Sequence, residues 1–149
     1  MAILKFSEKD KMASRVMPAG WYSFEVVQVK DPVKSSSGKS FNLMSQFRVI
    51  ENDEFEGKEI EIAFNTKMNN PSVMGTLVLM PHTYLLHLAA ATANVDLKEV
   101  PEDLDTESLK GLKFDGKVEK GIYEGIILNT ISGFLPFGKG VEKSDDVPF

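Results

Sequence analysis

Two stretches of this chain, residues 41–50 and 58–66, alternate between apolar and polar side chains. Successive side chains of a β-strand point to opposite faces, so a period of two predicts strands that bury one face in a core. The apolar positions are alternate residues of each stretch: Phe41, Leu43, Phe47 and Val49, then Ile60, Ile62 and Phe64. Because isolated strands are unstable in water, this pattern requires a sheet of several strands.

Further strands are predicted from composition and from turn residues. A first strand is expected over Trp21 to Lys30, which is rich in aromatic residues and valine and follows the turn residues Pro18-Ala19-Gly20. A final hairpin is expected over Leu112 to Lys120 and Ile122 to Ser132, with its turn at Gly121.

Helical signals lie mainly in the second half of the chain. His82 to Asn94 is the best helix candidate, because its apolar residues recur at helical spacing and alanine favours helix. A second short helix, capped by Asp105 or Thr106, is expected to end near Gly111. The apolar run from Val73 to Met80 fits either a short strand or a helical turn.

These elements predict one mainly β domain over residues 18–137. About five strands with a helix between the third and the fourth fit a five-stranded Greek-key barrel, the OB-fold, and a small β-sandwich is the alternative. Residues 1–17 are expected to form an irregular or short helical arm. Gly138 and Gly140 are expected to open a flexible tail over residues 138–149.

The composition excludes several classes of chemistry. The chain of 149 residues has no cysteine, so it has no disulfide, thiolate nucleophile or cysteine-ligated zinc. The first residues lack the long apolar stretch of a signal peptide, and no run approaches the length of a membrane span. We therefore expect a cytoplasmic protein without a membrane partner.

The net charge of -5 opposes nucleic-acid binding at first sight, but the charges are unevenly distributed. Acidic residues gather in 51–61, in 99–107 and at the C-terminal end. Lysines gather in two other places: Lys30, Lys34 and Lys39, then Lys110, Lys113, Lys117 and Lys120. A groove can therefore be locally positive on this acidic protein.

The last five residues, Asp145-Asp146-Val147-Pro148-Phe149, combine carboxylates with an aromatic ring. Pro148 fixes its own φ and holds Val147 extended, which lowers the entropy lost on docking into a basic pocket with an apolar floor. This ending resembles the C-terminal tip of bacterial single-stranded-DNA-binding proteins (SSB), Asp-Asp-Ile-Pro-Phe, with Val147 in place of isoleucine. The resemblance implies docking of replication and recombination proteins. The alternative is a frayed acidic tail.

The body resembles a family of phage-encoded single-stranded-DNA-binding proteins over roughly residues 18 to 135. The matching segments are Pro18-Ala19-Gly20-Trp21-Tyr22, Ser36-Ser37-Gly38-Lys39, Phe55-Glu56-Gly57-Lys58, the alanine-rich helix, and Lys117 to Gly125. The resemblance implies an OB-fold core and a role in phage DNA replication or recombination. It assigns no binding residues.

Binding of single strands without sequence preference needs rings for base stacking and a basic groove for the phosphates. The candidate rings are Trp21, Tyr22, Phe41, Phe47, Tyr123 and Phe134, of which Trp21 and Tyr123 are favoured because their polar edges tolerate partial exposure. The candidate cations are Lys34 and Lys39 on a Ser-Gly loop, Arg48, and Lys113 with Lys117 on one strand face. The alternatives are that the phenylalanines fill the core and that the lysines are simply solvated.

Catalytic alternatives are weaker. His82 and His87 lie five residues apart, on different faces of the predicted helix, so they are poor metal partners. The acidic residues between 53 and 61 suggest a metal-dependent nuclease, but solvated charge is their ordinary explanation. Gly38-Lys39-Ser40 echoes a phosphate-binding loop but lacks the earlier glycine and lies between two strands. No catalytic residue, metal or cofactor is predicted.

The leading hypothesis is a protein without catalytic activity that binds single-stranded DNA during phage DNA replication, recombination or repair. Its tip would recruit partner proteins, and would lie in its own basic groove when DNA is absent. The alternative hypothesis is a decoy that uses the tip to occupy pockets made for SSB and does not bind DNA. The sequence does not predict the oligomeric state.

Overall fold

The two alternating stretches form neighbouring strands in the computed structural model, which describes residues 2–34, 38–74, 77–123 and 126–141. Strand β3 (Phe41–Ile50) pairs antiparallel with β4 (Glu59–Asn65). The side chains of Phe47 and Ile62 are fully buried, while their sequence neighbours Arg48 and Glu61 are exposed. The period-two prediction is therefore confirmed for both strands.

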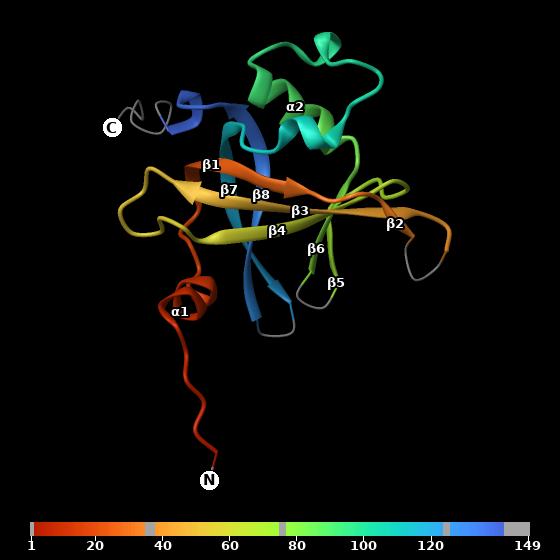
Figure 1. The fold of residues 1–149 in the computed structure, drawn as a ribbon. Helices are drawn as coiled ribbons and strands as arrows, with labels where there is room; N and C mark the ends of the chain where they lie inside the picture. The colour runs from red at the N-terminus through yellow and green to blue at the C-terminus, as the bar shows by residue number, and fades with distance from the viewer. Residues whose placement is uncertain (1, 35–37, 75–76, 124–125, 142–149) are drawn as a thin grey trace.

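The sheet curls into a nearly closed barrel (Figure 1). Its strand order is β5-β6-β4-β3-β1-β7-β8, and β2 pairs with β3 outside this path. Only the β4–β6 pair is parallel among the pairs of described strands. The remaining strands are β1 (Gly20–Val29), β2 (Val33–Lys34), β5 (Ser72–Met74), β6 (Leu77–Pro81), β7 (Lys113–Tyr123) and β8 (Ile126–Pro136).

The expectation of five strands is wrong, because the described residues form eight. The additional strands are β2 and the β5–β6 hairpin. Strands of two or three residues, such as β2 and β5, are too short to show a period in the sequence. The run from Val73 to Met80 holds two strands, and β6 pairs parallel with β4 so that Val78 and Met80 enter the core.

The predicted position of the last turn is also wrong. Gly121 lies within β7, opposite Leu128 of β8, and the pairing continues to Tyr123 opposite Ile126. Gly121 does not have a positive φ, so its backbone conformation is open to any residue and requires no turn. The two strands therefore stay paired as far as Tyr123 and Ile126, beyond the predicted turn.

The principal helix is confirmed as α2 (Tyr84–Ala93), which buries Leu85, Leu88 and Ala89 against one end of the barrel. It follows β6 and precedes β7, and it ends at Asn94, whose φ of 56° is left-handed. Two 3₁₀ turns, η1 (Leu97–Glu99) and η2 (Thr106–Leu109), lie beside α2. The Asp105 side chain accepts a hydrogen bond from the Glu107 backbone N–H, so the predicted cap at this turn is confirmed.

The barrel is filled by phenylalanines that contact one another. The Phe114 ring stacks on Phe24 at 5.5 Å and meets Phe47 edge-on at 5.3 Å, and all three are fully buried. The candidate Phe47 is therefore a core residue and is not available for stacking with a base. Phe134 is partly buried and packs on Phe114 at 5.6 Å.

The segment before β1 lies along the seam where β4 and β8 approach each other. Helix α1 (Glu8–Ser14) begins at Ser7 with a capping box to Asp10. Beyond it, Met17 is fully buried, and its backbone N–H donates to Asn129 Oδ1 at 2.7 Å while Asn129 Nδ2 donates to the Met17 carbonyl at 2.9 Å. The packed body therefore includes residues that precede Pro18.

Candidate functional site

A basic end of the barrel brings lysines together with an exposed aromatic ring. Lys34 of β2 lies directly opposite Phe41 at the start of β3, and paired residues of an antiparallel ladder project to the same face. The Phe41 side chain is 46% exposed. The Lys34 side chain also approaches Gly38, because a Cβ built on Gly38 would be 3.9 Å from Lys34 Cε. The sequence predicted both residues as DNA contacts, and the structure places them side by side.

The backbone under Phe41 is held by hydrogen bonds on two sides. The Phe41 N–H donates to Thr66 Oγ1 at 2.9 Å, and the Thr66 N–H donates to the Phe41 carbonyl at 3.1 Å. The amide of Asn65 donates to Asn42 Oδ1 at 2.7 Å and to Ser40 Oγ at 3.1 Å. The exposed ring therefore projects from a fixed strand end.

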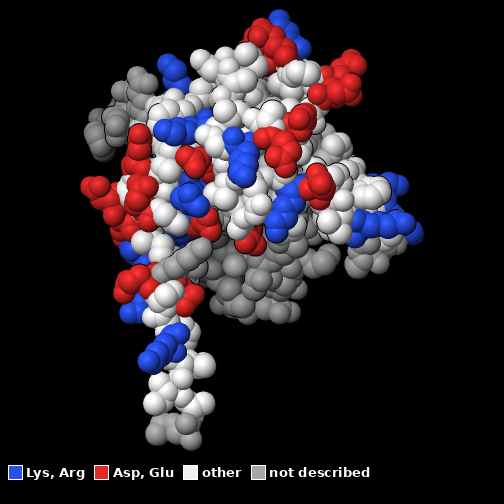
Figure 2. Space-filling model, in the orientation of Figure 1, with Lys and Arg blue, Asp and Glu red and all other residues white. Residues whose placement is uncertain are grey.

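Charge at this end is of one sign. The basic end, which we define as the described residues 33–34, 38–42 and 65–67, contains Lys34, Lys39 and Lys67 and no carboxylate. Figure 2 shows lysines gathered at this edge of the molecule, where β2 lies in Figure 1. Lysines gathered on one surface create a positive potential there, which attracts an anion such as phosphate.

The outer face of the sheet differs, because its charges are paired across the strands. Arg48 lies between two carboxylates. Arg48 Nη2 is 3.2 Å from Glu59 Oε2, and Arg48 Nη1 is 4.0 Å from Glu25 Oε1. Glu25 lies opposite Lys113, whose Nζ is 5.4 Å from the centre of the Phe137 ring. Figure 2 shows this mixture of acidic and basic side chains. Arg48 thus stands between two carboxylates, which weakens its attraction for phosphate.

A row of amides runs beside these ion pairs. Gln28 Nε2 donates to Gln46 Oε1, and Gln46 Nε2 donates to Glu61 Oε1 at 3.2 Å. Each group is already hydrogen-bonded to its neighbour on the next strand. This part of the face offers a ligand few unpaired donors.

The Trp21 indole is covered by residues near the end of the described chain, so one face of the ring is not exposed. A Cβ built on Gly140 would lie 2.4 Å from Trp21 Cε3, and one built on Gly133 would lie 3.4 Å from Trp21 Cη2. Gly140 is buried, so only a residue without a side chain fits over the indole. The indole is partly buried between two glycines, and its face toward Gly140 is covered.

A buried carboxylate supports the same contact. Asp115 is fully buried, accepts a hydrogen bond from Ser23 Oγ at 2.7 Å through Oδ1, and accepts one from the Val141 N–H at 2.8 Å through Oδ2. The packed body therefore extends beyond Phe137, to Val141. We call Trp21, Asp115, Gly140 and Val141 the C-terminal clasp.

Tyr22 is also engaged within the body. Its hydroxyl donates to the Pro18 carbonyl at 2.7 Å, and its ring meets Phe55 edge-on at 6.2 Å. Burial, and secondarily the Glu54 carboxylate, raises the pKa of its phenol. These contacts give Tyr22 a structural role that accounts for its partial burial.

The other predicted site residues are dispersed. Lys117 is exposed on β7, opposite Trp21 on one side and Gly133 on the other. Tyr123 ends β7, but its side chain lies outside the described residues. The proposed docking tip, Asp145 to Phe149, lies outside them as well.

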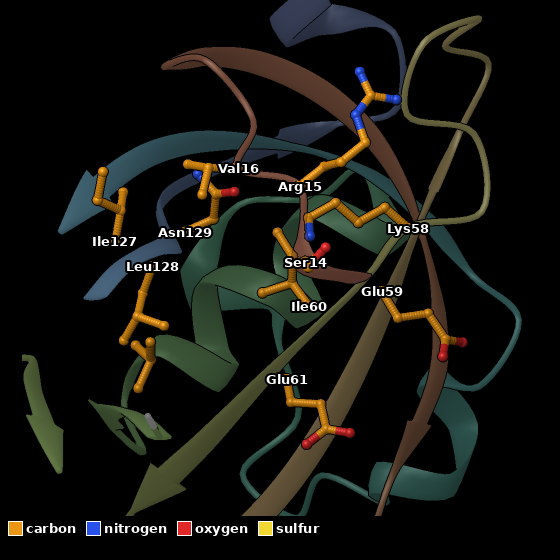
Figure 3. Close-up of a pocket in the computed structure, with 11 residues that line it drawn as sticks. Ser14, Arg15, Val16, Lys58, Glu59, Ile60, Glu61, Ile127, Leu128 and Asn129 are labelled. Atoms are coloured by element: carbon orange, nitrogen blue, oxygen red, sulfur yellow. The ribbon is translucent and has the colours of Figure 1, made fainter. Parts of the chain in front are cut away.

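The sequence did not reveal a polar hollow of about 170 Å³ at the seam between β4 and β8 (Figure 3). Lys58 is buried there, and its Nζ donates to the Met12 carbonyl at 3.3 Å. Burial, and secondarily the nearby Arg15 guanidinium, lowers the pKa of Lys58. Arg15 itself donates to the Glu54 carboxylate at 2.8 Å and lies over the Phe55 ring. The sequence carried one signal of the burial of Lys58, because Lys58 falls on the same side of the alternating strand pattern as the apolar Ile60 and Ile62.

Within the described ranges, no three side chains of the histidine, aspartate or glutamate type gather as a set of metal ligands. None of the described helices combines the length and apolar character needed to cross a membrane.

No protein-family model matches the chain, and no curated protein sequence matches it significantly.

Proposed function

We propose that this protein binds single-stranded DNA without sequence preference and without catalysis, and that the basic end of the barrel is the contact surface. The observation that carries the proposal is the exposed Phe41 ring beside Lys34, on a surface without a carboxylate. A ring stacks on any base and lysines attract any phosphate, so this pair of features suits a strand of arbitrary sequence.

The topology supports an OB-fold for this barrel. Strands β1, β3 and β4 follow one another as antiparallel neighbours, β7 returns to pair with β1, and β8 pairs with β7 and approaches β4. If β2 and the β5–β6 hairpin are additions, five strands remain, and α2 falls between the third and the fourth. OB-folds bind oligonucleotides with the second and third strands and the loop between the first and second. Phe41 begins the second of these five strands, and Lys34 and Lys39 lie on that loop.

The proposal is tested by titrating a fluorescently labelled oligo-dT with the full chain and following anisotropy at increasing salt. We expect saturable binding that weakens steeply with salt, and weaker binding to a duplex of the same length. Absence of binding at low salt, or an affinity that does not respond to salt, would refute the assignment of the basic end.

We further propose that the residues Asp145 to Phe149 recruit proteins of replication, recombination or repair in a bacterial host infected by a phage. The support is their resemblance to the SSB tip and their chemistry, two carboxylates followed by an apolar pair and an aromatic ring. Deleting residues 144–149 should abolish capture of host replication proteins while the chain still binds oligo-dT. If the chain acts only as a decoy, the intact protein captures those proteins but shows no binding to oligo-dT.

A further inference from the structure

The residues that precede α1 expose large apolar side chains. Ile3, Leu4 and Phe6 are 79%, 77% and 67% exposed, which is more than any other large apolar side chain among the described residues. Apolar residues gathered in this way mark a surface that contacts another molecule. We call Ala2 to Phe6 the arm.

The arm is directed away from the body by the structure that follows it. The capping box between Ser7 and Asp10 fixes the start of α1 directly after the arm. The far end of α1 is attached to the body, because Lys58 donates to the Met12 carbonyl and Arg15 donates to Glu54. Figure 1 shows the arm extending from the barrel on the side opposite α2.

An apolar hollow of about 380 Å³ lies on the α2 side of the barrel, between α2, η1 and η2. Its walls include Ala89, Val100 and Leu104, and Val95 and Leu112 on its edge are exposed. This volume lies in the range of hollows that hold several apolar groups. Because the arm points away from this side of its own barrel, a hollow on another copy is the one it can reach.

Charge identifies which surface the arm fits. The arm carries one charged side chain, Lys5, whereas the hollow is bordered by Glu99, Asp103 and Asp105. Docking an arm in the hollow brings opposite charges together. Pairing two arms brings their lysines together, which is unfavourable.

We propose that the arm of one copy docks in the apolar hollow of a second copy, with Lys5 facing the acidic border. The two contacting surfaces differ, so the association is heterologous and continues from copy to copy unless the rotation closes a ring. This proposal does not depend on the DNA-binding function.

The test uses two full-length variants and sedimentation velocity over a wide range of protein concentration. The arm variant carries Leu4→Lys and Phe6→Ser, and the hollow variant carries Val95→Lys and Leu112→Lys. All four positions are exposed, so both variants should fold, which circular dichroism verifies. Ile127→Ser, an exposed apolar position outside both surfaces, is the matched control.

We expect the wild-type chain and the control to form dimers and larger species as concentration rises, and each surface variant to remain monomeric. A mixture of the two variants should form a dimer and stop there, because one intact arm then meets one intact hollow. A monomeric wild-type chain at every concentration would overturn the proposal. Self-association of the hollow variant would also overturn it, because the arms would then be pairing with one another.

Discussion

The basic end and the C-terminal clasp each hold one aromatic residue that the sequence proposes as a base-stacking platform. At the basic end, Phe41 is 46% exposed on a hydrogen-bonded strand end with Lys34 beside it. At the clasp, Trp21 lies under Gly140 and against Gly133. The polar edge of an indole, which favoured Trp21 in the sequence, therefore does not predict whether the face of the ring is open.

The largest expected effect is a difference in the free energy of unfolding between variants of Trp21 and of Phe41. Trp21→Ala should lower the free energy of unfolding by about 2–4 kcal/mol, somewhat less than for a fully buried ring, because it empties the space under Gly140. Phe41→Ala should change that free energy by less than about 0.5 kcal/mol, because the ring is largely exposed. Urea denaturation measures both. Equal losses at the two positions would remove the distinction between a structural ring and a surface ring.

The clasp is tested next through its glycine. Gly140→Ala should lower the free energy of unfolding by about 1–3 kcal/mol, because the added Cβ would lie 2.4 Å from Trp21 Cε3. Gly121→Ala is the matched control: no atom outside the adjacent residues lies within 4 Å of its added Cβ, and the position lacks a positive φ. Thermal unfolding of the two variants gives the comparison. A harmless Gly140→Ala would show that the clasp is not closed in solution.

The charges of the basic end and of the outer face of the sheet can be compared through the salt dependence of oligo-dT binding. Replacing both Lys34 and Lys39 with glutamine should reduce the slope of log K against log salt by about 1.4 for oligo-dT, if each contacts one phosphate. Arg48→Gln should leave the slope nearly unchanged, because Glu25 and Glu59 already flank this guanidinium. Anisotropy titrations at several salt concentrations measure the slopes. A larger change for Arg48 would move the binding surface to the outer face of the sheet.

The smallest effect concerns Lys58, which lies at the seam between β4 and β8 and outside the basic end. Its folded-state pKa is lowered by burial and by Arg15, so between that value and its ordinary 10.5 the unfolded chain binds more protons. Stability contributed by this group therefore rises as pH increases through the folded-state pKa. Lys58→Met removes this term, and the difference in unfolding free energy between wild type and variant should shift in favour of wild type at alkaline pH. A pH-independent difference would contradict the inferred burial.

Much of the fold could be predicted because the long strands carry a period of two. Residues 41–50 form β3 as expected, and α2 lies within the helix predicted from 82 to 94. The run from Val73 to Met80 fitted either a short strand or a helical turn, because strands of three and five residues are too short for a local period to decide between them. The turn was misplaced because glycine permits a reversal at Gly121 without requiring one.

The candidate site was less predictable, because exposure depends on contacts between distant residues. Nothing near Trp21 in the sequence indicates that Gly140, far along the chain, covers it. Arg48 has the ordinary sequence context of a phosphate contact, and only the strand register places it between two carboxylates. Lys34 and Phe41 were predicted separately, and the β2–β3 pairing is what brings them together.

The most direct test of the account compares the affinities of Phe41→Ala and Trp21→Phe for oligo-dT at one salt concentration. Trp21→Phe keeps a ring in the clasp, so its affinity should stay close to that of the wild-type chain. Loss of a stacked base should weaken binding by Phe41→Ala by about 1–3 kcal/mol, or about 5- to 150-fold. Wild-type affinity in Phe41→Ala, together with weakened binding in a correctly folded Trp21→Phe, would contradict the account.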